Sequence, residues 1–569
     1  MKNSNYPLYK VDNISNLKEL IENASSKYSN KTAFEYRIKG NNIKKVTYKE
    51  LKDNINSLGT AFYSMGLKDS HIAVIGENSY EWIVTYFATV NGSNVIVPID
   101  KELSAQEIKN TLIDSNCRAI VYSHKHSNII KEIGDQVPEI EYFIHMDGKG
   151  DNNRFLSYED LMKTGNELVS QGHNEYMENE IDENKLAAII YTSGTTGVSK
   201  GVMLSHGNLA ANTVGILGHV TVHETLVLIL PIHHTFGFTA GVLSMIHLGT
   251  KVCINKGLKS VSKDIMSYKP TDLMLVPLFL EKMYKKIWDK ANKSGKAGLL
   301  RRTIKISNLL LKIGIDIRRK IFKNVIDGFG GNLKLIICGG APLDPKYIQG
   351  FRDFGINVLN GYGITECSPV ISVCRNDYFR DGSIGQILSC CEVKIDKLTS
   401  SDDGEILVKG KTVMLGYYKN EEATKETMDG DWFRTGDIGK IDDDGFLYIT
   451  GRKKNLIVLR NGKNIYPEEL EMLISNISYV EEVLVYCEGD RIDTDTNIIA
   501  EVYLDNEYIA SNEIEDPKKQ LEKDIEAINN TIPYYKNIKE IRIRENEFEK
   551  TTTKKIKRFA IKTVDKSNI

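Results

Sequence analysis

The stretch Tyr191-Thr-Ser-Gly-Thr-Thr-Gly-Val-Ser-Lys200-Gly201 combines glycines with five Ser or Thr hydroxyls and one lysine. The apolar run Leu186 to Ile190 before it predicts a buried strand, and Ser205-His-Gly-Asn208 after it carries the residues that begin a helix. Glycines allow backbone N–H groups to converge on an anion, and hydroxyls donate further hydrogen bonds. The stretch therefore favours a phosphate-binding loop. An ordinary polar turn has the same composition, so that alternative stays open on this evidence.

The length, composition and net charge of the chain restrict the class of protein. A chain of 569 residues predicts two or more domains, and 41% apolar with 26% charged residues is a soluble globular balance. The net charge of −2 argues against a nucleic-acid binder. Eight scattered cysteines and a polar start without a signal peptide indicate a reduced, cytoplasmic protein. Thr225 to Gly249 is apolar but interrupted by Pro231 and three histidines, which predicts strand, loop and helix rather than a membrane span.

Helix and strand signals alternate before the glycine-rich stretch. Thr47-Tyr-Lys-Glu50 and Ser104-Ala-Gln-Glu107 are capping boxes that predict helix starts, and Ile72 to Ile75 and Ala119 to Tyr122 read as strands. This alternation predicts an α/β fold with parallel sheets covered by helices. We interpret this half of the chain as scaffold, because it carries no evident chemistry of its own.

Two motifs after the glycine-rich stretch carry groups suited to a nucleotide. In Gly339-Gly-Ala-Pro342, small residues at a strand end allow a flat ring to approach the backbone. In Asn360-Gly-Tyr-Gly-Ile-Thr-Glu366, the tyrosine can stack on a purine and the threonine can donate to a phosphate. Glu366 is a candidate Mg²⁺ ligand, since Mg²⁺ keeps several waters and asks for only one or two carboxylates.

The last third of the chain changes pattern. Asp431-Trp-Phe-Arg-Thr-Gly-Asp437 ends in a carboxylate that could accept both ribose hydroxyls. Asp442-Asp-Asp-Gly445 predicts a hairpin turn, because a calcium loop would require glutamate where Lys453 stands. From Arg452 onward the strand and helix signals predict a separate small α+β domain. We therefore expect a large domain over 1–451 and a small one over 452–569.

Two further stretches have both a functional and a purely structural interpretation. Leu230-Pro-Ile-His-His-Thr-Phe-Gly237 places two histidines where they could line a pocket, although most histidines near apolar residues are structural. Lys285 to Lys323 is basic and amphipathic, and Asp316 is its only acid after Asp289. Such a helix pair can lie on an anionic membrane, with contact expected over Lys296–Lys323. A solvated helical face is an equally good interpretation.

In their order along the chain, these motifs resemble those of the AMP-forming acyl-activating (adenylate-forming) superfamily, and most closely its long-chain fatty acyl-CoA synthetases. The resemblance runs from about Thr47 to Arg558. It implies ATP, Mg²⁺ and CoA as cofactors and co-substrates, and a mobile C-terminal lid that turns about Lys454. The nucleotide- and CoA-binding residues that it implies are Thr192, Ser193, Gly194, Thr195, Thr196, Lys200, Gly340, Ala341, Asn360, Gly361, Tyr362, Thr365, Asp437, Arg452 and Gly462.

The resemblance also implies catalytic roles. The tail Glu549-Lys-Thr-Thr-Thr-Lys-Lys-Ile-Lys-Arg558 is similar to the family pattern Pro-Lys/Arg-Thr-x-x-Gly-Lys-Ile-x-Arg, which places the catalytic lysine on Lys555. Glu549 replaces the family's proline and Lys554 its glycine, so Lys554 is a neighbouring cation that could compete for the role. Thr192, His234 and Glu366 are the other catalytic residues implied, with Glu366 as the metal ligand. Residues from Gly241 onward would border the acyl pocket.

The resulting hypothesis is activation of a medium- to long-chain fatty acid as an acyl-adenylate, followed by transfer to CoA. The basic insertion Lys285–Lys323 and the string Ile364-Thr-Glu-Cys-Ser-Pro369 resemble those of the fatty acyl members of the family, and this resemblance implies a fatty acid. An aryl-acid CoA ligase and a fatty acyl-AMP or acyl-carrier-protein ligase are the alternatives within the family. A non-catalytic acyl-nucleotide binder and a lipid-docking protein are alternatives from other classes. Acyl chain length and oligomeric state are not indicated.

Overall fold

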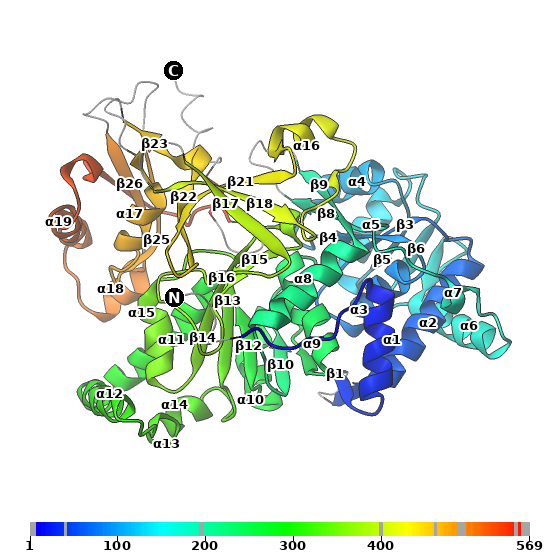
Figure 1. Cartoon of the computed structure of the whole chain (residues 1–569), viewed down its shortest axis with the longest axis horizontal. Helices are drawn as coiled ribbons and strands as arrows, with labels where there is room; N and C mark the ends of the chain where they lie inside the picture. The colour runs from blue at the N-terminus through cyan, green and yellow to red at the C-terminus, as the bar shows by residue number, and fades with distance from the viewer. Residues whose placement is uncertain are drawn as a thin grey trace. The chain divides into compact units, whose positions relative to one another are not determined.

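Figure 1 shows the computed structural model of the chain, which describes residues 7–38, 42–192, 199–397, 402–459, 464–487, 497–550 and 556–558. The chain divides into two units. The first contains Met1–Glu392 and Val408–Phe433, and the second contains Val393–Leu407 and Arg434–Ile569. The sequence places its domain boundary between residues 451 and 452, and that boundary stays a prediction.

A nine-stranded sheet forms one part of the first unit, in the order β16-β15-β14-β13-β12-β10-β11-β1-β2. Its central strands run parallel, and β2, β15 and β16 pair antiparallel at the two edges. Apolar side chains of β10, β12 and β13 are buried in one core. The strands are β1 Thr32–Arg37, β2 Ile43–Thr47, β10 Thr225–Leu228, β11 Lys251–Ile254, β12 Asp272–Leu275, β13 Leu335–Gly339, β14 Asn357–Gly363, β15 Val370–Val373 and β16 Gln386–Ile387.

An eight-stranded sheet forms the other part, in the order β19-β9-β8-β4-β3-β5-β6-β7. The strands from β8 to β7 in this order run parallel, whereas β9 pairs antiparallel with β8, and β19 pairs antiparallel with β9. The predicted parallel α/β architecture is thus confirmed. The strands are β3 His71–Ile75, β4 Val95–Ile99, β5 Cys117–Tyr122, β6 Tyr142–His145, β7 Phe155–Ser157, β8 Leu186–Thr192, β9 Lys200–Ser205 and β19 Gly416–Tyr417.

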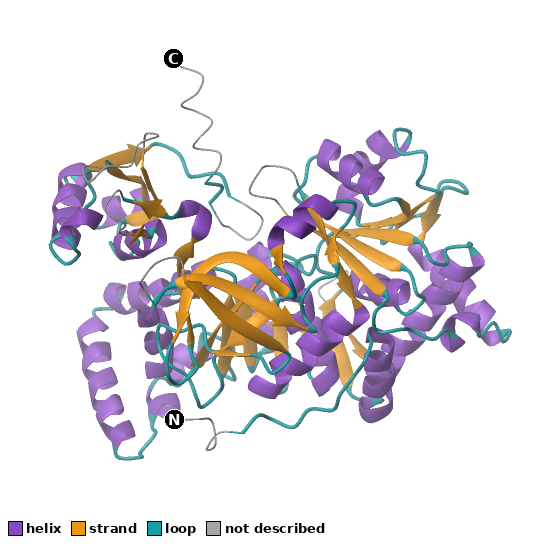
Figure 2. Cartoon of the chain, turned by 45° about the horizontal axis from the view of Figure 1, so that its top comes forward, coloured by secondary structure: helices purple, strands orange, loops and turns teal. Residues whose placement is uncertain are grey.

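Helices flank the strands of the first unit, as Figure 2 shows in purple and orange. Both predicted capping boxes are present, at Thr47 for α2 and at Ser104 for α4. The helices are α1 Leu17–Tyr28, α2 Tyr48–Ser64, α3 Tyr80–Val90, α4 Ala105–Asp114, α5 Ser127–Gly134, α6 Tyr158–Ser170, α7 Glu175–Glu178, α8 His206–His219, α9 Ser244–Leu248, α10 Val261–Tyr268, α11 Pro277–Lys293, α12 Ala297–Lys312, α13 Arg318–Ile321, α14 Lys323–Asp327, α15 Pro345–Asp353 and α16 Glu421–Thr427. A π-helix, η3 (Phe236–Leu243), precedes α9.

Strands β17 Cys391–Lys397, β18 Gly404–Gly410, β20 Met428–Asp429, β21 Trp432–Ile441 and β22 Leu447–Arg452 make a five-stranded sheet. The predicted hairpin turn between β21 and β22 is present, since Oδ1 of Asp442 accepts hydrogen bonds from the backbone N–H groups of Asp444 and Phe446. Gly445 in this turn has φ +80°, a backbone conformation that favours glycine.

The part of the second unit that follows β22 is the predicted α+β arrangement. Its three-stranded sheet has the order β25-β26-β27, and β23 pairs with β24. Apolar side chains of α17, β25, β26 and α19 share one core. The elements are β23 Ile457–Val458, β24 Asn464–Ile465, α17 Pro467–Ile474, β25 Val480–Cys487, β26 Ile498–Leu504, α18 Asn506–Ser511, α19 Pro517–Asn529 and β27 Glu540–Arg544. Among the residues that the structure describes, no helix has both the length and the apolar character that crossing a bilayer requires.

Candidate functional site

The two ends of the glycine-rich stretch form the base of a β-hairpin. Thr192 is the last residue of β8 and pairs with Lys200, the first residue of β9. The Thr192 hydroxyl donates to the backbone carbonyl of Lys200 at 3.5 Å. Helix α8 follows β9 directly and is capped by Ser205, as predicted. Ser193, Gly194, Thr195 and Thr196 lie outside the described residues, so their roles stay predictions.

Tyr417 connects Lys200 with Glu366. Its strand, β19, pairs with β9, and the Lys200 ammonium lies 5.1 Å from the centre of the Tyr417 ring. The Tyr417 hydroxyl donates a hydrogen bond of 3.0 Å to Oε1 of Glu366. Burial, together with the Glu366 carboxylate, raises the pKa of Tyr417 well above its usual range, so its hydroxyl stays a donor. The sequence interpretation missed Tyr417, because its position depends on a pairing between distant strands.

Gly340, Gly361 and Tyr362 meet at an apolar pocket. Strands β13 and β14 are parallel neighbours and align Gly339 with Gly361. Gly340 has φ +90°, so its conformation favours glycine. The pocket has a free volume of about 60 Å³. Its lining residues are Ile216, Leu217, Val220, Val222, Phe236, Ala240, Met245, Ile337, Gly339, Gly340, Gly361, Tyr362, Gly363, Pro369, Val370 and Val373.

The other expected residues near this pocket differ in their placement. Asn360 is buried, and its Oδ1 has no hydrogen-bond partner among the described residues. An amino group such as that of adenine could supply the missing donor. Ala341 is exposed and Thr365 is half-buried, and neither lines the pocket. Gly241 does not line this pocket, since a Cβ there would face Leu228 and Met274, whereas Met245, farther along the same stretch, does line it. The expectation that the residues from Gly241 onward border the acyl pocket stays a prediction.

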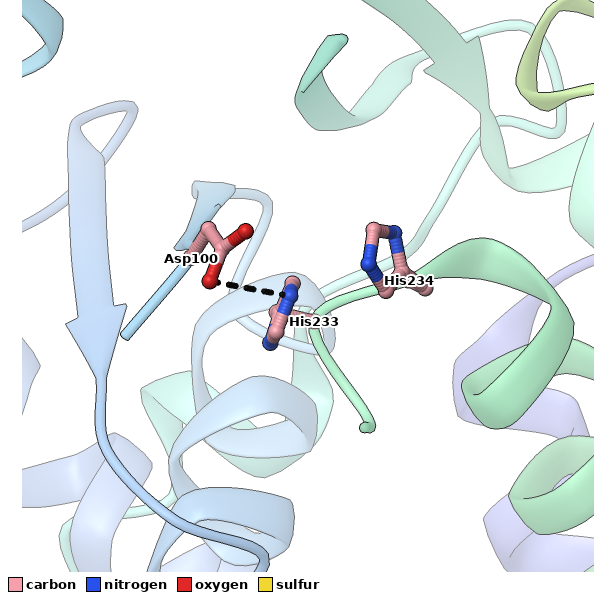
Figure 3. Close-up of side chains that lie close together, drawn as sticks. All are labelled: Asp100, His233 and His234. Carbon is pink, nitrogen blue, oxygen red and sulfur yellow. Dashed lines mark ion pairs between the residues drawn. The ribbon is translucent and has the colours of Figure 1, made fainter. Parts of the chain in front are cut away.

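His234 belongs to a cluster with His233 and Asp100 (Figure 3). Nε2 of His233 lies 3.4 Å from Oδ1 of Asp100, and the two imidazole rings have centroids 4.3 Å apart. His233 is only 6% exposed. The sequence interpretation selected His234 and missed Asp100, which directly follows the apolar strand β4.

In the second unit, Asp437 and Arg452 face each other across the β21–β22 pair. Nε of Arg452 lies 2.6 Å from Oδ1 of Asp437, and the Asp437 side chain is 4% exposed against 40% for Arg452. The side chain of the predicted hinge residue Lys454 is exposed. Its pKa is nevertheless lowered, first because the surrounding protein partly desolvates the ammonium and then because Arg452 and Arg558 are nearby cations. Gly462 and Lys555 lie outside the described residues.

The segment that follows Lys555 is anchored in the second unit. Ile556 forms an isolated bridge with Lys550, and Nη1 of Arg558 donates to the carbonyl of Val485 at 3.2 Å. Arg558 also pairs with the Glu471 carboxylate. Burial raises the pKa of Glu471 to about 7, against the opposing effect of Arg558. These contacts fix the C-terminal side of the lysine-containing tail.

The first unit therefore contains groups that fit a nucleotide and its metal. A half-buried carboxylate held by a tyrosine hydroxyl suits Mg²⁺, which prefers oxygen ligands and needs one or two carboxylates. Gly340, in a backbone conformation that favours glycine, and the buried amide oxygen of Asn360, which has no hydrogen-bond partner in the described part of the chain, suit a purine ring. The adjoining apolar pocket suits a hydrophobic acyl group.

Comparisons with known proteins agree with this chemistry. The family model described as AMP-binding enzyme matches residues 21–418. The chain is 29% identical over 447 residues to Long-chain-fatty-acid--CoA ligase FadD15 of Mycobacterium bovis, covering 75% of this chain and 72% of the relative. It is 30% identical over 482 residues to Long-chain-fatty-acid--CoA ligase 6 of Mus musculus, covering 79% and 68%.

A solved structure, that of the anthranilate CoA ligase AuaEII in complex with anthranoyl-AMP, shares the fold. It has a TM-score of 0.78 at 20% identity and covers 100% of this chain and 99% of its own. The match of the family model, which spans more than half of the sequence, shows that this chain belongs to the AMP-binding enzyme family.

Proposed function

We propose that this chain is an AMP-forming fatty acid–CoA ligase. It activates a medium- to long-chain fatty acid as an acyl-adenylate and then transfers the acyl group to CoA, giving acyl-CoA, AMP and pyrophosphate. The observation that carries the proposal is the apolar pocket whose wall includes Gly340 and Tyr362, because it joins a hydrophobic acyl site to a place for a purine. The names of the matched relatives support the same substrate class.

The first step makes a poor acyl donor reactive. A carboxylate oxygen attacks the α-phosphate of ATP, and the bond to pyrophosphate breaks. In the later acyl transfer the leaving group is then AMP instead of oxide. The transition state of the attack on the α-phosphate gathers negative charge, which Lys200 and Thr192 in the first unit and Lys555 in the tail would stabilise electrostatically. Glu366 would hold Mg²⁺, which would supply further neutralisation of the phosphate charge. Asp437 and Arg452 would bind the ribose or phosphate.

The second step transfers the acyl group to a thiol. We propose that the mobile region 452–569 turns about Lys454, which withdraws Lys555 and brings Gly462 to the pantetheine arm of CoA. The two half-reactions then use different residues. This division of labour is open to direct test, because preformed acyl-adenylate bypasses the first step.

The length of acyl chain that the protein accepts depends on how far the apolar pocket can expand. Its free volume of about 60 Å³ is well below the roughly 300–1,000 Å³ of typical ligand sites, so side chains must move to admit a long acyl chain. An aryl acid is the second candidate, because the anthranilate CoA ligase has the same fold. The basic insertion and the fatty-acid relatives favour the long acid.

We also propose that α12 contacts an anionic membrane surface, while the protein is otherwise cytoplasmic. Leu299 and Leu309 of α12 are each 65% exposed, and Ile313, which directly follows this helix, is 68% exposed. Arg302 and Lys305 are exposed on the same helix. Apolar side chains beside basic ones are the pattern of interfacial helices. Not all of the predicted basic surface is available, because Nη1 of Arg319 donates to the carbonyls of Leu333 and Gly355.

A vesicle pelleting assay tests the membrane contact. Vesicles containing phosphatidylglycerol should pellet the protein, and Leu309→Asp combined with Ile313→Asp should abolish this. Met266→Asp, which alters another exposed apolar residue, is the matched control and should pellet normally. Equal pelleting of all three proteins would refute a role for α12.

The function itself is tested with purified protein, ATP, Mg²⁺ and CoA across acetate, octanoate, palmitate, oleate and benzoate. Thioester from the longer acids supports the proposal, whereas thioester from benzoate alone would favour an aryl-acid ligase. Pyrophosphate release without acyl-CoA would point to a carrier-protein thiol. No pyrophosphate with any acid would refute an adenylating enzyme and favour a non-catalytic binder.

A further inference from the structure

Asp100 lies at the edge of the eight-stranded sheet from which the glycine-rich stretch also departs. Strands β4 and β8 are parallel neighbours, and Ile96 is level with Ala188. Continuing this register to the strand ends places Asp100 level with Thr192. Ligands of parallel α/β sheets bind at the carboxyl ends of strands, so Asp100 stands at the functional edge although no motif includes it.

The two histidines come from the other sheet. They lie in the turn after β10, and Asn78 fixes the backbone of that turn. Nδ2 of Asn78 donates to the carbonyl of Leu230 at 2.8 Å, and Oδ1 of Asn78 accepts from the backbone N–H of Ile232 at 3.1 Å. Asp100 contacts the imidazole of His233, whereas Asn78 contacts the backbone of the turn. The ion pair of Asp100 with His233 thus connects the edges of the two sheets.

The contact between these groups is short enough for an ion pair but lacks the geometry of a hydrogen bond. Oδ1 of Asp100 and Nε2 of His233 are 3.4 Å apart, and this buried Nε2 has no hydrogen-bond partner within the described part of the chain. In enzymes without substrate, functional hydrogen bonds are often long and shorten when substrate binds. A small closure would convert this contact into a hydrogen bond that fixes the orientation of the imidazole.

His233 in turn restricts His234. Figure 3 shows the two imidazoles beside each other. Their ring centroids are 4.3 Å apart and their planes are inclined by 43°, so the two rings lie in contact. Both histidines line a second pocket, together with Ile190, Leu204 and Phe238. Its free volume of about 10 Å³ is room for roughly one water. Such a small, mainly apolar space strengthens electrostatic interactions within it.

We propose that Asp100 is a positioning residue for the thioester-forming half-reaction, acting through His233 on His234. The inference rests on the proposed function. As the thiol attacks, its S–H bond breaks and the proton moves to the His234 imidazole. A bond forms between sulfur and the acyl carbon, the bond from that carbon to the adenylate oxygen breaks, and AMP leaves with the electron pair. His234 then returns the proton to solvent.

The Asp100→Asn variant tests the inference, because asparagine keeps the shape of the side chain and removes its charge. Single-turnover thioester formation from preformed palmitoyl-adenylate and CoA should fall by about 10- to 100-fold, as is typical when an orienting partner is lost. Pyrophosphate release from ATP, Mg²⁺ and palmitate should change less than about threefold, which also shows that the variant folds. Asp100→Glu restores the carboxylate and should recover part of the thioester rate.

Asp147→Asn is the matched control, since it removes another Asp–His pair of the same unit, with 3.8 Å between His145 Nε2 and Asp147 Oδ1. Both half-reactions should be unchanged in it. Equal losses in the two half-reactions of Asp100→Asn, or an unchanged thioester rate, would overturn the inference alone. So would stoichiometric zinc in the wild-type protein that Asp100→Asn loses, because the cluster would then be a metal site. A wild-type protein that forms no thioester from the adenylate overturns the proposed function as well.

Discussion

The Tyr417 hydroxyl donates to Oε1 of Glu366 at 3.0 Å. The face of the same ring lies under the Lys200 ammonium, with 5.1 Å between the nitrogen and the ring centre. The Tyr417 side chain on β19 therefore contacts both the Lys200 ammonium on β9 and the Glu366 carboxylate in the segment after β14. In the proposed reaction Glu366 would hold the metal and Lys200 would stabilise the phosphate charge, so the relative placement of the two side chains would determine how well both act on one triphosphate.

Tyr417→Phe should weaken the adenylation step. The substitution removes the hydrogen bond to Glu366 but keeps the ring beneath Lys200. A hydrogen bond to a charged group contributes about 1.5–3 kcal/mol, so we expect at least a tenfold lower rate of pyrophosphate release at limiting Mg²⁺. Pyrophosphate release measured against Mg²⁺ concentration checks this. Tyr418→Phe changes the adjacent tyrosine, which packs against His71, and should behave as wild type. An unchanged Mg²⁺ dependence in Tyr417→Phe would contradict the assignment.

The parts of this fold that the sequence predicts are local. The capping boxes at Thr47 and Ser104 are interactions between residues three apart, so composition and spacing suffice to find them. The hairpin turn at Asp442 is equally local. Strand-end motifs such as those of Gly340 and Tyr362 could be placed for a different reason, because parallel strands bring their carboxyl ends to one edge of the sheet whichever strands are neighbours.

The parts that could not be predicted depend on which strands become neighbours. Tyr417 reaches Glu366 only because β19 pairs with β9, and Asp100 meets His233 only where two sheets adjoin. Local sequence does not encode such pairings. Arg319 shows the opposite error, since a basic run suggested an exposed surface whereas its guanidinium bonds two backbone carbonyls.

Lys555→Ala should separate the two half-reactions. The loss of one charge that stabilises the transition state typically costs 10²–10³-fold in rate, so pyrophosphate release should fall by about that factor. Thioester formation from preformed adenylate should stay within about threefold of wild type. Lys554→Ala is the matched control and should retain both activities. If Lys554→Ala instead loses adenylation, the catalytic lysine is the neighbour that replaces the family's glycine.

Ala240→Leu should shorten the acyl chains that are accepted. Ala240 lines the apolar pocket from the π-helix η3, and three more carbons there occupy space that a long chain needs. We expect kcat/KM for palmitate to fall at least tenfold while that for acetate changes little. Overpacking can also destabilise the fold by about 1–3 kcal/mol, so thermal unfolding is measured in parallel. Equal losses for both acids would show that this pocket does not hold the distal acyl chain.

His206 should make the stability of the protein fall in mild acid. Its side chain is buried at the start of α8, and burial lowers its pKa to about 3. The unfolded chain binds a proton near pH 6.5 and the folded chain does not, so this stability is present above about pH 6.5 and is lost as the pH falls toward 3. Between pH 7 and pH 5 the loss should be about 2 kcal/mol. His206→Gln should lack this component in urea unfolding at the two pH values, whereas His173→Gln, at an exposed position, should keep it.

Equal pH dependence of the wild-type and His206→Gln proteins would mean that the folded chain protonates His206 as easily as the unfolded one does. The contact in which the backbone N–H of Leu17 donates to Nδ1 of His206, at 3.4 Å, would then have to break in mild acid without loss of stability.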